Sequence, residues 1–289
     1  MKQTDRLHRF LFEQQNIRGE FVQLDDTWRE VLTRADYPAP LRAVLGEAMA
    51  AAALLVATLK ISGSLTMQLR GSGPMHLLVV QAFSDGGIRG LARWHGEVSP
   101  GSLASLSGSG QLVITIDPEE GERYQGIVPL VGEHLHDALA HYFNQSEQLP
   151  TRLWLSASDE AAAGLLIQAL PGTSEDEDAW NRVLHLGETV TGDELRSLDV
   201  ETLLRRLYHE ETLRLFEPSP VMFQCSCSRE KIINMLRQLG EDETNSIISE
   251  QGRIDVDCEF CGQSYRFDSV DVHALFATDD YPLQTKTVQ

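Results

Sequence analysis

Short runs of apolar residues, separated by turn sequences, dominate the first 170 positions of the chain. These runs have the length of β-strands and lie at 65–69, 76–83, 88–94, 113–116, 124–130, 152–156 and 165–170. Glycine and proline stand between them, for example at 71–74 and 85–87, and favour reversal of the chain. Residues 18–19 are interpreted in the same way, as a turn before a strand-like run at 21–24. The pattern predicts many short strands.

Two segments in this region have a helical pattern instead. Residues 41–59 are rich in alanine and leucine and follow Pro40, a residue that suits the first turn of a helix. Residues 133–143 form a second predicted helix. Many short strands with few helices favour an α+β fold over a doubly wound one. We therefore predict an N-terminal α+β core domain over residues 1–171.

A helical connector is predicted after this domain, over residues 172–220. An acidic run at 175–178 is interpreted as a solvated helix start, and Thr191 with Glu194 has the spacing of a capping box. An apolar stripe at helical spacing consists of Leu195, Leu198, Leu203, Leu204, Leu207 and Tyr208. The stripe must cover an apolar surface, yet its surroundings are dense in charge. We expect the segment at 180–216 to be helical, docked and only moderately stable.

The last part of the chain, residues 221–289, has the pattern of a small separate module. Its predicted elements are a helix capped by Ser228 and ended by Gly240, a second helix around 247–248, a hairpin formed by 253–257 and 264–267, and a closing helix at 270–276. Residues 278–289 are predicted to be a frayed tail.

Composition restricts the partners of the chain. The 289 residues are 42% hydrophobic, enough to bury a core, and carry 43 acidic against 24 basic side chains, a formal net charge of −19. Such a surface repels nucleic acid and anionic lipid. The longest apolar run, at 48–59, is shorter than a membrane span, and the first ten residues lack the pattern of a signal peptide. We expect a cytoplasmic protein with neither nucleic-acid nor membrane partners.

All four cysteines fall in the last module and form two close pairs. The pairs are Cys225-Ser226-Cys227 and Cys258-Glu259-Phe260-Cys261. In a reducing compartment this distribution favours metal binding or redox chemistry over permanent disulfides, and four thiolates make a closed tetrahedral zinc site. The second pair has the spacing of a zinc knuckle, whereas the single residue inside the first pair requires an irregular backbone. We predict one zinc ion bound by Cys225, Cys227, Cys258 and Cys261.

Zinc binding at these cysteines also has an energetic consequence. A module of this size buries little core, and zinc contributes about 10–16 kcal/mol to folding in small zinc-binding peptides. Each pair also holds two thiolates close enough to be oxidised to a local disulfide, which would eject the metal and unfold the module. From the residues alone, a redox switch and a purely structural zinc site are both open.

Other motifs indicate no catalytic chemistry. The Gly-Ser-Gly sequences at 71–73 and 108–110 lack the lysine and the helix start of a phosphate loop and are interpreted as turns. His134, His136 and His141 lack the spacing of a catalytic zinc site and are interpreted as exposed helix residues. We assign no catalytic residue and do not expect an enzyme.

Several sequences resemble those of a known family. They are the two cysteine pairs, Arg-Leu-Tyr-His-Glu-Glu at 206–211, Gly-Glu-Arg-Tyr-Gln-Gly at 121–126 and Ser-Glu-Gln-Leu-Pro-Thr at 146–151. Together with the order of domain, connector and zinc module, they are similar to the heat-shock protein 33 family, the bacterial redox-regulated chaperones. The resemblance covers nearly the whole chain and all four cysteines.

The resemblance implies an ATP-independent holdase that is inactive while reduced and zinc-bound. Oxidative and heat stress would then produce two disulfides, Cys225 with Cys227 and Cys258 with Cys261. It also implies that zinc is released, that the C-terminal region unfolds and the connector loosens, and that the protein changes from a monomer to a homodimer holding unfolding client proteins. No client-contact residue follows from it.

Two other classes of function compete with this interpretation. One is a zinc-containing enzyme, against which four cysteine ligands count because they leave no open coordination position. The other is a protein adaptor built on a purely structural zinc site with four cysteine ligands. The acidic residues of the last module, at 241–243, 255, 257 and 259, disfavour nucleic acid as the partner of such an adaptor, but not protein.

Overall fold

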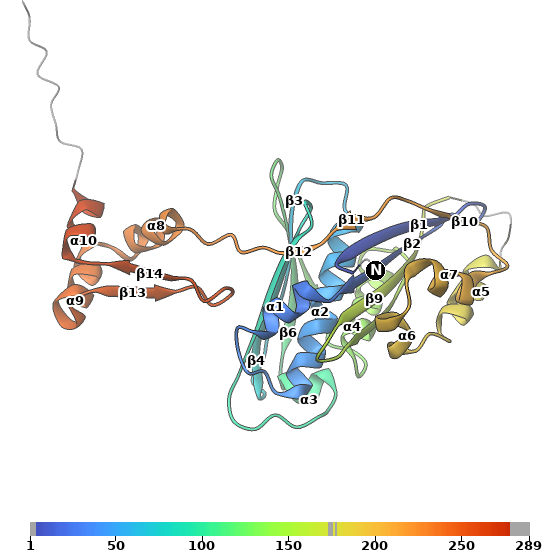
Figure 1. Ribbon diagram of the computed structural model, residues 1–289, viewed down its shortest axis with the longest axis horizontal. Coiled ribbons are helices and arrows are strands. Elements are labelled where there is room, and N and C mark those ends of the chain that lie inside the picture. Colours follow the sequence, from blue (N-terminus) through green and yellow to red (C-terminus); the bar gives the residue numbers. More distant parts are fainter. Residues whose placement is uncertain (1–3, 173–175, 177, 278–289) are drawn as a thin grey trace, which may run out of the picture. The chain divides into compact units, whose positions relative to one another are not determined.

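Two six-stranded β-sheets form the body of residues 1–225 in the computed structural model, and a long helix packs against both (Figure 1). Sheet A has the order β10 (Leu213–Leu215), β1 (Arg6–Phe12), β2 (Ile17–Leu24), β9 (Ala162–Ala169) and β8 (Thr151–Ala157), with β11 (Ser219–Pro220) also paired to β1. Sheet B has the order β12 (Met222–Phe223), β5 (Gly87–Trp94), β4 (Met75–Phe83), β3 (Gly63–Arg70), β6 (Gln111–Pro118) and β7 (Tyr124–Val128). The predicted α+β fold is confirmed.

The long helix is α2 (Ala39–Thr58), and it forms the centre of the main core. Its side chains contact strands of both sheets, and twelve of its residues are buried. By length and composition α2 is apolar enough to cross a membrane, but 67% of its most apolar stretch is buried inside the protein. Burial of this kind is typical of the core helix of a globular unit.

Three shorter helices complete this core. They are α1 (Asp26–Leu32), α3 (Leu103–Ser107) and α4 (Leu135–Gln145). The amphipathic α4, close to its predicted position, packs against β8 and α2. The sequence pattern did not indicate α1 or α3, which are only one or two turns long.

The predicted connector packs on sheet A through three helices, α5 (Ala179–Gly187), α6 (Gly192–Ser197) and α7 (Val200–Tyr208). Residues of β2 face opposite ways: Ile17 and Phe21 contact the connector, whereas Val22 and Leu24 contact the α2 side. The capping box at Thr191 is confirmed, and the apolar stripe lies in a second core that we call the connector core. Its buried members from sheet A are Phe10, Phe12, Ile17, Phe21, Ala163, Leu165 and Ile167.

Two details of the predicted secondary structure are wrong. Residues 18–19 are not a turn but lie inside β2, because they pair with β1 on one side and β9 on the other. Position 19 is a glycine in this strand because the ring of Phe10 on β1 leaves no room for a side chain there. Residues 213–215, predicted to continue the helical segment, form β10 instead. That strand pairs with β1, with Phe10 opposite Leu215 and Phe12 opposite Leu213. The backbone of β1 supplies hydrogen bonds that the local sequence does not reveal.

The smaller C-terminal unit has its own set of elements. They are α8 (Arg229–Leu239), α9 (Glu241–Gln251), β13 (Ile254–Asp257), β14 (Ser264–Phe267) and α10 (Ser269–Phe276), close to the predicted positions. Ser228 caps α8 as predicted by accepting a hydrogen bond from the backbone of Lys231. The buried core of the unit comprises Leu236, Ile254, Phe267 and Val272, with a shell of partly buried apolar residues.

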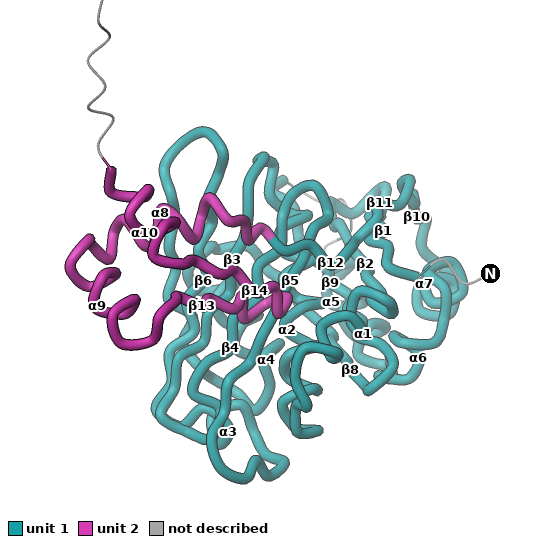
Figure 2. The backbone as a smooth tube through the Cα atoms, turned by 60° about the vertical axis from the view of Figure 1, so that its left-hand side comes forward, with its two compact units in different colours: residues 1–225 teal, residues 226–289 magenta. Residues whose placement is uncertain are grey.

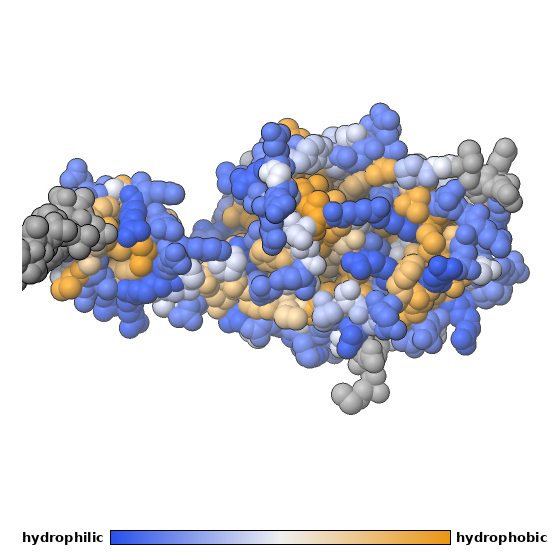
Figure 3. Space-filling view, turned by 90° about the horizontal axis from the view of Figure 1, so that it is seen from above, coloured by the Kyte–Doolittle hydropathy of each residue, from blue (hydrophilic) through white to orange (hydrophobic). Residues whose placement is uncertain are grey.

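The structure describes residues 4–172, 176 and 178–277, and the chain divides into two compact units at Cys225 (Figure 2). Unit 1 spans residues 1–225, which includes the predicted connector, and unit 2 spans residues 226–289. The predicted tail at 278–289 and most of the acidic run at 175–178 lie outside the described residues. In the face of unit 1 seen in Figure 3, hydrophilic residues predominate, with hydrophobic ones between them.

Candidate metal centre

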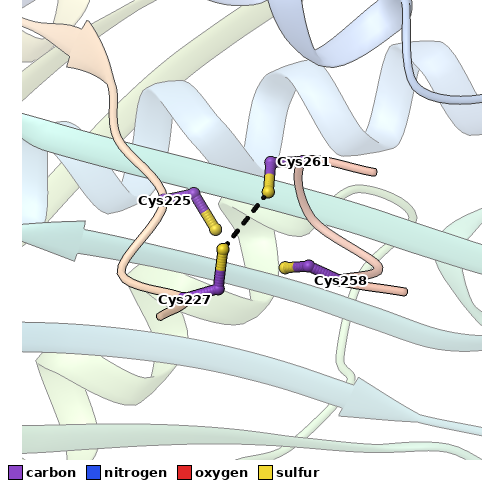
Figure 4. A group of neighbouring side chains, drawn as sticks. All are labelled: Cys225, Cys227, Cys258 and Cys261. Carbon is purple, nitrogen blue, oxygen red and sulfur yellow. Dashed lines mark hydrogen bonds between the residues drawn. The ribbon is translucent and has the colours of Figure 1, made fainter. Parts of the chain in front are cut away.

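Four thiols, the complete cysteine set of the chain, meet in one cluster (Figure 4). Cys225 and Cys227 come from the segment between β12 and α8, and Cys258 and Cys261 from the turn between β13 and β14. The four Sγ atoms lie within 4.8 Å of one another, and those of Cys227 and Cys261 are 3.4 Å apart. All four side chains are half-buried thiols. The structure therefore brings together every residue of the predicted zinc site.

The sulfur separations fit a tetrahedral zinc site. With Zn–S bonds of about 2.3 Å, the sulfurs of a tetrahedron lie about 3.8 Å apart. A disulfide would require about 2.05 Å, so the sulfurs stand at ligand spacing rather than bonding distance. The donor set of four soft sulfur atoms also suits zinc. The pairing predicted for the oxidised protein stays a prediction, since the 3.4 Å distance joins one cysteine from each pair.

A tight turn positions the second pair. The backbone N–H of Gly262 donates to the carbonyl of Cys258 at 2.7 Å, and the N–H of Cys258 donates to the carbonyl of Gln263 at 2.9 Å. Gly262 has φ +72°, in the left-handed region that glycine adopts at little cost. The hairpin beneath this turn is in register, with Asp257 opposite Ser264. These bonds direct Cys258 and Cys261 toward the same point.

The segment before the first pair is fixed to sheet B in unit 1. Strand β12 runs parallel to β5, and the N–H of Gln224 donates to the carbonyl of Ile88 at 2.9 Å. Directly after it, the Sγ of Cys225 lies 3.5 Å from a guanidinium nitrogen of Arg89. Arg89 is itself held by Gln81, whose Oε1 accepts from it at 2.7 and 3.0 Å. The chain is thus anchored up to the first cysteine.

A tyrosine hydroxyl contacts the first pair from within unit 2. The hydroxyl of Tyr265 on β14 donates to the Sγ of Cys227 at 3.1 Å. This hydrogen bond is the main reason why the pKa of Tyr265 is raised to about 12. No sequence pattern had indicated a role for Tyr265 or Arg89. For Tyr265 the available signal was its place in a predicted strand that leads away from the second cysteine pair.

The other motifs of the sequence form turns or contribute no side chain to this cluster. The two Gly-Ser-Gly sequences meet each other, since the N–H of Gly73 donates to the carbonyl of Ser107 at 2.8 Å and that of Ser109 to the hydroxyl of Ser72 at 3.1 Å. Their interpretation as turns is confirmed. His134 and His136 stack at 5.1 Å between ring centroids, and no group of three metal-binding side chains among the described residues includes them.

Comparison with known proteins places these features in one family. A family model described as Hsp33 protein matches residues 5–268. The chain belongs to the Hsp33 protein family. The 33 kDa chaperonin of Nitrosococcus oceani is 51% identical over 276 residues, which cover 96% of each chain. The 33 kDa chaperonin of Azotobacter vinelandii is 49% identical over 285 residues, again with 96% of each chain covered.

A solved structure agrees with the fold. The 33 kDa chaperonin of Thermotoga maritima superimposes with a TM-score of 0.83 over 94% of this chain and 97% of its own, at 24% sequence identity. In the present member of the Hsp33 family, two of the sequences that carry the family resemblance also meet in space. Tyr124, from residues 121–126, donates to Glu147, from residues 146–151, at 3.0 Å, and Tyr142 donates to the same carboxylate oxygen at 2.6 Å.

Proposed function

We propose that this protein is a redox-regulated, ATP-independent holdase chaperone of the cytoplasm. In the reduced state its four cysteines bind one zinc ion and the protein is inactive. On oxidation it forms two disulfides, releases zinc, unfolds its C-terminal region and binds unfolding proteins. The observation that carries the proposal is the convergence of all four thiols within 4.8 Å in a member of the Hsp33 family.

The small core of unit 2 explains why metal ligation would control its folding. Within the described part of the unit, four buried side chains form that core, and three of them are aliphatic. A core of this size buries little apolar surface for the length of chain that it has to order. When bound, zinc joins the segment before α8 to the β13–β14 turn and supplies the missing stability. Without four ligand thiolates, unit 2 is expected to unfold.

Oxidation removes these ligands in a balanced two-electron step. Two thiolates and one hydrogen peroxide give one disulfide and two hydroxide ions: the sulfurs lose two electrons and the O–O bond is broken. A disulfide sulfur is no longer an anionic ligand. We assign the disulfides to Cys225 with Cys227 and to Cys258 with Cys261, the pairing that the family resemblance implies. Each of these pairs is local in sequence and can close without the other.

The connector offers the apolar surface that a holdase requires. In unit 1, strands β10, β11 and β12 lead from α7 to Cys225, and the helices α5, α6 and α7 cover the apolar face of sheet A. Loss of order at Cys225 would release the short β12 first, because only two residues pair it with β5. Fraying from there into the connector would uncover the connector core, which is a suitable surface for clients and for a second copy of the chain.

Aggregation of a client tests the proposal. Light scattering of a thermally unfolding client should be suppressed by peroxide-treated protein and not by reduced, zinc-loaded protein. Return of the oxidised sample to dithiothreitol and zinc should abolish the suppression again. Equal suppression of aggregation by both forms would mean that the zinc site is purely structural. Suppression by neither form would contradict the proposed chaperone function.

A further inference from the structure

Tyr265 links the two halves of the cysteine cluster. Its backbone belongs to the hairpin that carries Cys258 and Cys261, opposite Val256 in the register, yet its hydroxyl donates to the sulfur of Cys227 in the other pair at 3.1 Å. The contact lies within unit 2. Because β14 is fixed by its pairing with β13, the hydroxyl is held in position and Cys227 is held against the hairpin.

A hydrogen bond donated to a thiolate changes its chemistry. The donor stabilises negative charge on sulfur, so the lone pair that attacks an oxidant becomes less nucleophilic. A donor from outside the ligand set also orients a metal-binding side chain, and removing such a donor typically weakens metal binding about 10- to 100-fold. For Cys227 both effects oppose oxidation and loss of metal.

We propose that Tyr265 is a positioning residue that selectively delays oxidation of the Cys225–Cys227 pair. The inference rests on the proposed redox function. The hydrogen bond from Tyr265 to Cys227 does not require the second pair to be reduced, because β14 begins after the turn that holds Cys258 and Cys261. In a protein oxidised only at the second pair, this hydrogen bond on Cys227 lasts until loss of the ligands unfolds unit 2 and opens the hairpin. Tyr265 thus makes completion of the switch conditional on unfolding of the hairpin.

Mass spectrometry can measure the two pairs separately. Trypsin cleaves after Arg214, Arg229, Arg253 and Arg266, which places the first pair in peptide 215–229 and the second in peptide 254–266. The reduced, zinc-loaded full chain is treated with hydrogen peroxide, and its remaining thiols are alkylated at intervals. Tyr265→Phe is compared with the native protein and with Tyr124→Phe, a matched removal of one hydroxyl in unit 1.

In Tyr265→Phe we expect loss of the first-pair thiols to be roughly tenfold faster, with the second pair changed by less than about twofold. Tyr124→Phe should match the native protein at both pairs. An unchanged first-pair rate in Tyr265→Phe would overturn the inference. Equal acceleration of both pairs would also overturn it, since that result indicates only a loosened fold. If neither pair forms a disulfide in the native protein, the proposed function fails instead.

A second variant and a spectroscopic measurement guard against a folding defect. Replacing Tyr265 with 3-fluorotyrosine keeps the ring and strengthens the donor, so the first pair should oxidise more slowly than in the native protein. In cobalt-substituted samples, the sulfur-to-cobalt charge-transfer band should shift in Tyr265→Phe and stay in place in Tyr124→Phe. A cobalt band unaffected by Tyr265→Phe, together with no slowing by fluorotyrosine, would contradict a hydrogen bond to a metal-binding sulfur.

Discussion

The ring of Phe10 on β1 lies directly over Gly19 on β2, so that a Cβ at position 19 would stand 2.1 Å from the ring. Phe10 is 1% exposed and belongs to the connector core. The glycine is therefore what allows a large aromatic side chain to lie flat between the sheet and the connector. Phe10 also packs among the side chains of the connector, the segment whose release the proposed mechanism requires.

Gly19→Ala should weaken docking of the connector. The added methyl forces Phe10 upward into the connector core, and overpacking of this kind costs about 1–3 kcal/mol. We expect a lower melting temperature and faster hydrogen exchange in α5, α6 and α7 of the reduced protein. Less oxidant or a lower temperature should then suffice for activation.

A double mutant isolates the contact behind this prediction. Phe10→Leu shortens the side chain above position 19, so the combination with Gly19→Ala should cost less than the sum of the two single changes. If the losses of stability in the two single mutants were strictly additive in the double mutant, the added methyl would not act through the Phe10 side chain.

Arg182 on α5 is expected to stabilise the docked connector through two carboxylates. Its Nε lies 2.7 Å from Glu211 and its Nη2 lies 2.8 Å from Asp176, and the Glu211 side chain is 7% exposed. Arg182→Gln should lower the free energy of unfolding by about 1–2 kcal/mol, because the largely buried carboxylate of Glu211 then has no cation beside it.

Arg152→Gln is the matched control. It removes an ion pair to Glu188 with both side chains about half exposed, which should cost less than about 0.5 kcal/mol. Hydrogen exchange of α5 and α7 compares the two, and equal effects would argue against a special role for Arg182.

Glu47 on α2 should make the stability of unit 1 depend on pH. Burial raises its pKa from 4.5 to about 7, so the folded protein keeps a proton that the unfolded chain releases above pH 4.5. The stability gained from this proton is complete below pH 4.5 and is lost as the pH rises to about 7. At pH 8 the buried charge costs about 3 kcal/mol.

The matching variant is Glu47→Gln, which mimics the protonated side chain at every pH. It should raise the melting temperature of the reduced protein at pH 8 and have a much smaller effect at pH 5. Calorimetry of both proteins, each zinc-loaded, measures this difference. A constant gain between pH 5 and pH 8 would contradict a proton held by Glu47 in the folded state.

Metal analysis of single Cys→Ser variants tests the ligand set. Each of the four cysteines lies within 4.8 Å of the others, so replacing any one should leave three sulfur ligands and weaken zinc binding severely. Since unit 2 depends on the metal, its exchange protection should fall in all four variants. Tight, stoichiometric zinc in one variant would remove that cysteine from the ligand set.

The order of disulfide formation is a further expectation. Cys258 and Cys261 lie in a turn of the small unit, whereas the first pair follows an anchored strand and accepts a hydrogen bond from Tyr265. We predict that the second pair oxidises first and that Cys225 and Cys227 react fully only under added heat or strong oxidant. Alkylation with mass spectrometry follows both pairs during a peroxide time course. Closure of the first pair ahead of the second, or of both together at low temperature, would refute a two-step threshold.

The sequence predicted those parts of the fold that depend on local interactions. The strands from β3 to β9 have short apolar runs bounded by turn residues, and α2 has a long apolar pattern after a proline. The caps at Thr191 and Ser228 were recognisable because the bonds span only three residues. The cysteine cluster was equally predictable, because each pair is local in sequence and four thiols in one small module are typical of a shared metal site.

Features that depend on distant partners could not be predicted from local patterns. Residues 213–215 form a strand only because β1, some 200 positions earlier, pairs with them along its edge. Gly19 resembled a turn residue because nothing near it in sequence indicates the ring of Phe10 above it. Tyr265 and Arg89 contact the cysteines through pairings of strands that single residue patterns do not specify.

Hydrogen exchange of the reduced and the oxidised protein tests the central claim most directly, because it follows unit 2 and the connector in the same sample. In the reduced, zinc-loaded state, α8, α9 and the connector helices α5, α6 and α7 should all be protected. After peroxide treatment at raised temperature, unit 2 and the connector should lose protection while α2 and sheet B keep theirs. Loss confined to unit 2 in a sample that suppresses client aggregation, with the connector as protected as before, would contradict the account.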